Sequence, residues 1–209
     1  MRFYRMRRAF SALRLKRQVA LPELAVEAWE WEHAGTGATV YHLQHASPLT
    51  LSIGFRTLPQ DSRGAPHVLE HVALCGSAKY PVRDPFFRML GRSLSVYMNA
   101  WTGADCTQYP FSTENAEDFC NLRAVYWDAA FHPRLAADDF AQEGWRWTVD
   151  AHGHVALAGV VYNEMKGALS DADALFCARQ QQARFGPASV YAALSGGDPA
   201  EIPRLTHAQ

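Results

Sequence analysis

The sequence lacks several features that would assign it to a common class of protein. No run approaches the roughly 20 consecutive apolar residues that span a bilayer, which argues against an integral membrane protein. It contains no Gly-x-Gly-x-x-Gly fingerprint, P-loop or Gly-x-Ser-x-Gly motif, so nucleotide-dependent and serine-hydrolase functions have no support. Its four cysteines form no Cys-x-x-Cys pair, and we expect free, buried thiols rather than a zinc ribbon or a disulfide scaffold.

Acidic side chains are absent from the start of the chain. Residues 1–17 carry seven basic side chains and no acidic one, whereas 13 basic and 21 acidic side chains follow. Such a start is typical of a transit peptide, a nucleic-acid-binding arm or a solvated tail. The spacing of Phe3, Met6, Phe10 and Leu13 indicates an amphipathic helix and favours a transit peptide over a nucleic-acid-binding arm. We predict a basic leader over residues 1–17 and one folded domain over 18–209.

The pattern of apolar residues predicts strands in series with interspersed helices. Leu49, Leu51, Ile53 and Phe55 alternate with polar or small residues, as in a half-buried strand. These elements suggest an α+β fold, an antiparallel sheet with helices packed on one face. Further strands are expected over 29–32 and 39–43 (as a hairpin), 95–102, 108–112 and 145–149; helices are expected over 66–74, 84–90 (capped by Asp84), 115–131 and from 159 past 178.

A His-x-x-Glu-His motif, His67 to His71, carries the chemistry. On a helix, His67 and His71 lie on the same face, so both can offer imidazole nitrogens to one Zn²⁺. Glu70 lies beside them, where a general base can take a proton from zinc-bound water. The order is that of the inverzincins. A chance occurrence on an exposed helix is the alternative reading of the motif alone.

A catalytic zinc site needs a third protein ligand as well as an open position. Glu164, in the helical stretch 159–167, offers one carboxylate, and Glu143 offers another. No local spacing rule chooses between them.

From Pro66 to about Asp198 the sequence resembles the pitrilysin/insulinase class of metallopeptidases, in its presequence-protease branch. The resemblance consists of several motifs in the same order across most of the chain. These are 66–71 with 74–77, 79–81, 84–86, 98–102, 109–113, 143–145, 159–167 and 195–199.

The resemblance implies a role for each candidate residue. His67, His71 and Glu164 would bind one Zn²⁺ per chain, and Glu70 would activate water. Asn99, Ala100, Trp101 and Thr102 match an edge strand on which relatives bind substrate peptide by β-augmentation. Trp101 replaces the more usual Phe, which would alter side-chain preference near the scissile bond. Glu143 would orient a zinc-bound histidine; a solvated glutamate at a helix end is the alternative.

The implied function is that of a zinc metalloendopeptidase that degrades short unstructured peptides, such as cleaved targeting presequences. Relatives are much longer, and an Arg and a Tyr from their distant half are expected to polarise the substrate carbonyl. We therefore expect residues 18–209 to be a truncated N-terminal peptidase domain, incomplete at its C-terminus, with the remainder of the enzyme or a complementary chain as its partner. The alternatives are a non-catalytic interaction subunit and an inactive fragment.

With the basic leader, a mitochondrial matrix location is expected; a cytoplasmic one is the alternative. No nucleic-acid or membrane partner is expected.

Overall fold

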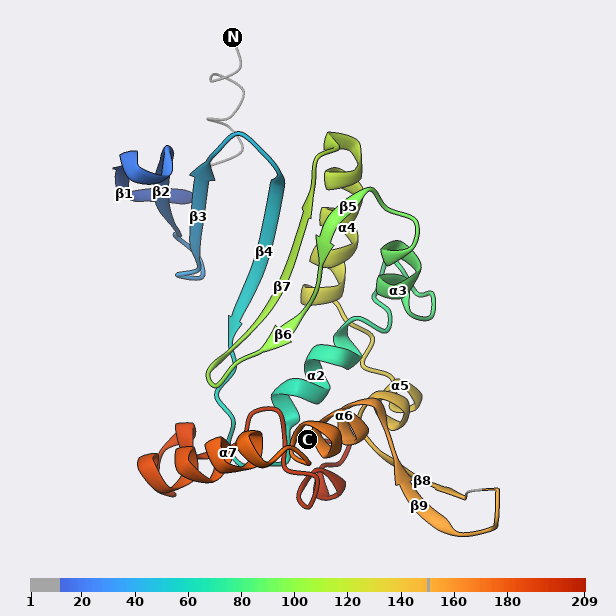
Figure 1. The fold of residues 1–209 in the computed structure, drawn as a ribbon. Helices are drawn as coiled ribbons and strands as arrows, with labels where there is room; N and C mark the ends of the chain where they lie inside the picture. Colours follow the sequence, from blue (N-terminus) through green and yellow to red (C-terminus); the bar gives the residue numbers. More distant parts are fainter. Residues whose placement is uncertain (1–11, 150) are drawn as a thin grey trace. The chain divides into compact units, whose positions relative to one another are not determined.

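Residues 12–149 and 151–209 are described by the computed structural model of the chain (Figure 1). The chain divides into two units, Met1–Ser47 and Pro48–Gln209. Among the described residues, no helix has the length and apolar character needed to cross a membrane.

The first unit is a three-stranded antiparallel sheet in the order β1-β2-β3. Strand β1 (Leu13–Leu21) leads through a short 3₁₀ turn, η1 (Pro22–Leu24), into β2 (Val26–His33), and β3 (Thr39–Gln44) completes the predicted hairpin. Strand β1 runs through the boundary expected at residue 17. Leu13, the last residue of the expected amphipathic helix, is therefore in a strand, and the rest of that helix lies outside the described residues. Arg14 and Lys16 form ion pairs with Glu32 of β2.

The second unit contains the main antiparallel sheet, and it confirms the predicted α+β architecture. Strand β7 (Cys106–Thr113) lies between β4 (Leu49–Arg56) and β5 (Ser95–Met98), and the two-residue strand β6 (Trp101–Thr102) also pairs with β7. The extended segment 95–102 is thus interrupted at Asn99-Ala100. In the described part of the chain, β5 and β6 pair with no strand other than β7, so they form an edge of the sheet.

Helix α4 (Ala116–Phe131) packs on one face of this sheet (Figure 1). The Asn115 side chain accepts hydrogen bonds from two backbone amides and so caps its first turn. Its Leu122 and Tyr126 form a core with Phe111 and Tyr109 of β7 and with Ile53 of β4. The alternation that predicted β4 therefore places Leu51, Ile53 and Phe55 on the core side, whereas Leu49 at the start of the strand is exposed.

Shorter helices lie beside the sheet and beyond its β6 end (Figure 1). They are α2 (Ala65–Ala73), α3 (Pro85–Leu90), α5 (Ala137–Glu143), α6 (Val160–Ala168) and α7 (Ala172–Phe185), with the hairpin β8 (Arg146–Val149) and β9 (Val155–Ala158) and the 3₁₀ turns η2 (Val190–Ala192) and η3 (Ile202–Arg204).

Two local expectations were wrong. The single long helix from residue 159 is two helices, because Ser170 donates its hydroxyl hydrogen bond to the Gly167 carbonyl and Asp171 accepts one from the Ala174 amide. Those side chains end α6 and begin α7. Asp84 does not cap α3: its backbone is left-handed (φ 52°), its side chain makes no capping hydrogen bond, and it pairs with Arg83 instead.

Candidate functional site

Helix α2 carries the His-x-x-Glu-His motif as predicted. Its apolar side chains Val68 and Val72 pack into a core with Val161 of α6, which turns the face bearing His67 and His71 toward a cavity. The two imidazole rings lie edge to face, with centroids 5.0 Å apart.

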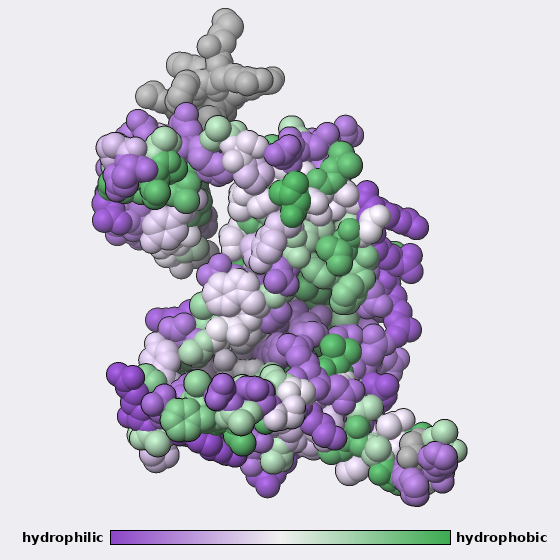
Figure 2. Space-filling view, in the orientation of Figure 1, coloured by the Kyte–Doolittle hydropathy of each residue, from purple (hydrophilic) through white to green (hydrophobic). Residues whose placement is uncertain are grey.

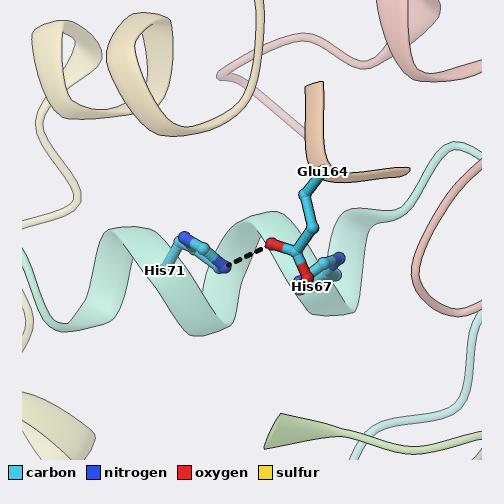
Figure 3. Close-up of side chains that lie close together, drawn as sticks. All are labelled: His67, His71 and Glu164. Atoms are coloured by element: carbon cyan, nitrogen blue, oxygen red, sulfur yellow. Dashed lines mark ion pairs between the residues drawn. The ribbon is translucent and has the colours of Figure 1, made fainter. Parts of the chain in front are cut away.

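Glu164, on α6, extends its side chain toward both histidines (Figure 3). Its Oε1 lies 3.8 Å from Nε2 of His67, and its Oε2 lies 3.8 Å from Nε2 of His71. Ligand atoms of the three residues all lie within 4.8 Å of one another, and they are the one group of this kind among the described residues that could hold a metal ion. Two imidazole nitrogens and one carboxylate oxygen are a donor set typical of catalytic zinc. The structure thus places Glu164, rather than Glu143, in this group.

Glu143 lies on the far side of His71 and is buried, so it is not a solvated helix-end residue. Its Oε2 accepts a hydrogen bond from Nδ1 of His71 at 3.1 Å, and its Oε1 accepts one from Nε2 of Gln142 at 2.9 Å. Arg83 in turn donates a hydrogen bond to Gln142. Nothing in the local sequence around Gln142 indicated this second layer of contacts.

The contact between His71 and Glu143 shifts the pKa values of both residues. Burial lowers the pKa of His71, but the hydrogen bond to Glu143 and the charges of Glu70, Glu143 and Glu164 outweigh it and raise that pKa above its ordinary value. Burial raises the pKa of Glu143, but the hydrogen bonds from His71 and Gln142 outweigh it and lower that pKa. The pair therefore favours a charged carboxylate and an Nδ1 atom that carries a proton.

His67 has a different partner at its outer nitrogen. Its Nδ1 lies 3.0 Å from the backbone carbonyl oxygen of Gly196. The segment around Gly196 belongs to the resemblance at 195–199, but a backbone acceptor leaves no signal in residue type, so its contact with His67 was not predicted. Both histidines therefore present Nε2 to Glu164 and are held at Nδ1.

Glu70 is buried on the same helix and receives a hydrogen bond from the Thr102 hydroxyl to its Oε2, at 2.6 Å. The Thr102 hydroxyl also lies 3.2 Å from that of Thr107, which lies 2.8 Å from that of Thr57. A threonine chain therefore ends on the Glu70 carboxylate. In the described part of the chain, the other carboxylate oxygen, Oε1, accepts no hydrogen bond.

A cavity of about 580 Å³ joins these groups to the edge of the sheet. The cavity is lined by all four residues predicted to bind substrate: Asn99, Ala100, Trp101 and Thr102. The two histidines, Glu70, Glu143 and Glu164 line it as well. Asn99 is engaged locally, because its Oδ1 accepts a hydrogen bond from the Ala100 amide and its amide nitrogen lies 3.4 Å from the Tyr97 hydroxyl.

Apolar side chains gather on the surface over β5 and α3, beside this cavity (Figure 2). Phe87 lines the cavity and is 66% exposed, and Leu94 and Val96 are exposed to a similar degree. Exposed apolar surface of this kind commonly marks a binding site.

The cysteines are free thiols, as expected, although only Cys75 is buried. Burial raises the pKa of the Cys75 thiol to about 12. It lines the cavity as a neutral group, so it offers neither a thiolate ligand nor a nucleophile.

Comparison with known proteins gives homologues over nearly the whole chain. Presequence protease, mitochondrial, of Mus musculus is 50% identical over 194 residues, that of Xenopus tropicalis 49% over 194, and that of Saccharomyces cerevisiae 46% over 205. These matches cover 90%, 90% and 95% of this chain but only 19%, 19% and 20% of the relatives, so the chain spans about a fifth of their length. No family model matches the sequence. The crystal structure of pitrilysin aligns over 94% of this chain and 20% of its own, with a TM-score of 0.68 and 19% identity, which shows the shared fold.

Proposed function

Because the chain belongs to the presequence-protease branch of the pitrilysin/insulinase class of peptidases, we propose that it carries the zinc-binding and general-base part of a zinc metalloendopeptidase. The substrates would be short unstructured peptides such as cleaved targeting presequences. The observation that carries the proposal is the convergence of His67, His71 and Glu164 within 4.8 Å beside Glu70, in a cavity bounded by an open sheet edge.

His67, His71 and Glu164 would hold one Zn²⁺. When bound, zinc would lower the pKa of a coordinated water and polarise a carbonyl group. The donor set fits the metal, since both Nε2 atoms face Glu164 and both Nδ1 atoms have acceptors outside the group. Glu143 would orient His71 through its Nδ1 hydrogen bond.

Glu70 would act as the general base. The Thr102 hydroxyl occupies Oε2 of this cavity-lining residue, which leaves Oε1 to take a proton from water and later return it to the leaving amine. The proton moves between water, Oε1 and the new amino group, so no covalent enzyme intermediate is needed.

The peptide would pair with the edge formed by Asn99–Thr102, as in β-augmentation. Ala100 lies between β5 and β6, and its amide already donates to Asn99 Oδ1. Within Asn99–Thr102, the backbone amide of Ala100 is therefore already engaged. Trp101, 40% exposed and lining the cavity, would contact a substrate side chain near the scissile bond.

Location in the mitochondrial matrix belongs to the same proposal. The relatives carry "mitochondrial" in their names, and residues 1–17 are rich in arginine. Deleting residues 1–11 leaves β1 complete, so this deletion tests mitochondrial import of the chain without removing part of a strand. The reporter-tagged chain is expected in mitochondria only when those residues are present.

A chimera tests the peptidase function. The part of the Saccharomyces cerevisiae relative that matches this chain is replaced by this chain, because the chain alone spans about a fifth of such proteins. The chimera is expected to cleave an unstructured presequence peptide. Glu70→Gln should lower turnover about 10²–10⁴-fold while zinc is retained, and Glu117→Gln, at an exposed position on α4, should change neither. A chimera that folds but does not cleave the peptide would favour a non-catalytic interaction subunit, and unchanged turnover in Glu70→Gln would remove the general-base role of Glu70.

A further inference from the structure

The backbone carbonyl of Gly196 contacts the outer nitrogen of His67. A carbonyl oxygen can only accept a hydrogen bond, so Nδ1 of His67, 3.0 Å away, must carry a proton. In the neutral ring, the lone pair then lies on Nε2, the atom that faces Glu164. We infer that the Gly196 carbonyl is a positioning group of the metal centre, which fixes the tautomer and direction of His67. This inference rests on the proposed zinc site.

The two histidines are held by different chemistry. His71 is held by a carboxylate, whose acceptor strength depends on the ionisation of Glu143. The Gly196 carbonyl accepts a hydrogen bond at every pH and belongs to no side chain. In water, neutral imidazole favours the opposite tautomer, with its proton on Nε2. The effect of the carbonyl on the tautomer of His67 can therefore be measured.

Glycines allow the carbonyl to reach the helix. A Cβ atom on Gly64, the residue before α2, would lie 2.9 Å from the Gly196 oxygen and 3.0 Å from the Gly197 Cα. A Cβ on Gly197 would lie 2.7 Å from the Ile202 side chain. Gly64 and Gly197 also have φ values of 74° and 102°, which favour glycine. Two backbones therefore approach more closely than side chains would permit.

Hydrogen bonds fix both ends of this approach. The Asp198 amide donates to the Ser62 carbonyl at 2.7 Å, and the Leu194 amide donates to the Ser62 hydroxyl at 3.1 Å. Ser62 lies just before Gly64, so residues 194–198 are tied to the entry of α2. The carbonyl between them has little freedom to move away from His67.

The chain just after this segment packs against both helices that carry the proposed ligands. Ile202 is fully buried against a core that includes Val68 of α2 and Val161 of α6. A Cβ on Gly196 would lie 2.9 Å from the sulfur of Met165, the residue after Glu164. The segment thus sets the orientation of His67 and contacts the helix that carries Glu164.

The first test is the tautomer of His67 in the metal-free chain, from ¹⁵N NMR at alkaline pH, where histidine side chains are neutral. The expected spectrum shows a protonated Nδ1 and an unprotonated Nε2. A protonated Nε2, or an equal mixture, would overturn the inference. This measurement needs no variant and no activity.

The second test compares the zinc affinities of Gly64→Ala and Gly186→Ala. Gly186 also has a positive φ (70°), and its ψ of 162°, against 22° at Gly64, makes an Ala at least as strained there. A Cβ on Gly186 would meet nothing within 4 Å, so this variant strains the backbone without touching Gly196. Gly64→Ala should weaken zinc binding about 10- to 100-fold, as outer-shell changes do, and should shift His67 away from the Nδ1–H tautomer; Gly186→Ala should do neither.

Equal affinities in the two variants would overturn the inference. Failure of the unmutated chain to bind zinc would instead remove the proposed function, and the NMR result would still decide whether Gly196 fixes the ring. If Gly64→Ala fails to fold, the tautomer of the unmutated chain decides alone.

Discussion

Replacing Glu143 should weaken zinc binding although its carboxylate lies outside the group of ligands. Its Oε2 is 3.1 Å from Nδ1 of His71, and its side chain is 6% exposed. Glu143→Gln keeps an oxygen that can accept this hydrogen bond but removes the charge. Glu143→Ala removes both, so the zinc affinity should fall in the order unmutated chain, Glu143→Gln, Glu143→Ala.

The size of the effect follows from the contact. Hydrogen bonds to charged groups contribute about 1.5–3 kcal/mol, and about 1.4 kcal/mol corresponds to a factor of ten. Glu143→Ala should therefore weaken zinc binding roughly 10- to 100-fold, which agrees with the range for outer partners of metal-bound histidines. Glu143→Gln should lie near the lower end of this range.

The assay is a zinc titration of the 209-residue chain against a competing chelator, at about pH 8. At lower pH, protons compete with zinc for His71, whose pKa is raised, and removing Glu143 would relieve part of that competition. The exposed variant Glu114→Gln serves as the matched control. If Glu143→Ala binds zinc as tightly as Glu114→Gln at this pH, the orienting role of Glu143 is refuted.

Three further predictions concern other parts of the structure. In the chimera, Thr102→Val should lower kcat about tenfold or more by removing a hydrogen bond to the Glu70 carboxylate, and KM should change little. Thr102→Ser should restore activity, and a Thr102→Val enzyme with full kcat would contradict the prediction. In the metal-free chain, the pKa of Glu143 is lowered, so this group stabilises the fold at pH values above its ordinary pKa of 4.5, and that stability is lost as pH falls. The pKa of His71 is raised, so this group stabilises the fold at pH values below its ordinary pKa of 6.5, and that stability is lost as pH rises. Urea unfolding should therefore show the largest loss from Glu143→Gln between those two values, and a loss independent of pH would contradict it. Leu122→Ala, at a fully buried core position, should cost about 2–5 kcal/mol, or a fall in Tm of roughly 5–15 °C by the usual scaling. Leu175→Ala, 40% exposed on α7, should change Tm little, and equal shifts for the two would show that the core is misassigned.

Short-range patterns predicted much of the fold. The alternation in 49–56 predicted β4, because burial of one face of a strand sets the period of its apolar residues. Helix α2 was predicted from Pro66 in its first turn and from Gly76-Ser77 after its end. Strand β9 and helix α5 were not predicted. Both are short, and their residues have no strong periodicity of their own. The break between α6 and α7 was not predicted, although the pair Ser170 and Asp171, whose side chains end one helix and cap the next, is a signal in the sequence that indicates it.

The site was only partly visible in the sequence. The spacing of His67, Glu70 and His71 is a local property of one helix, so it could be read directly. Glu164 lies 93 residues beyond His71, and only a resemblance selected it before the structure brought it within 3.8 Å of both histidines. The hydrogen bond from Thr102 to Glu70 and the Gly196 carbonyl depend on tertiary contacts, which no residue pattern encodes.

The most direct test of the proposed metal centre is the zinc content of the 209-residue chain. The purified protein is stripped with a chelator, dialysed against zinc and then against metal-free buffer, alongside Glu164→Ala and the exposed control Glu114→Ala. We predict close to one zinc per chain in the unmutated protein and the control, and weakened binding in Glu164→Ala. A well-folded chain that retains no zinc, or Glu164→Ala that binds it undiminished, would contradict it.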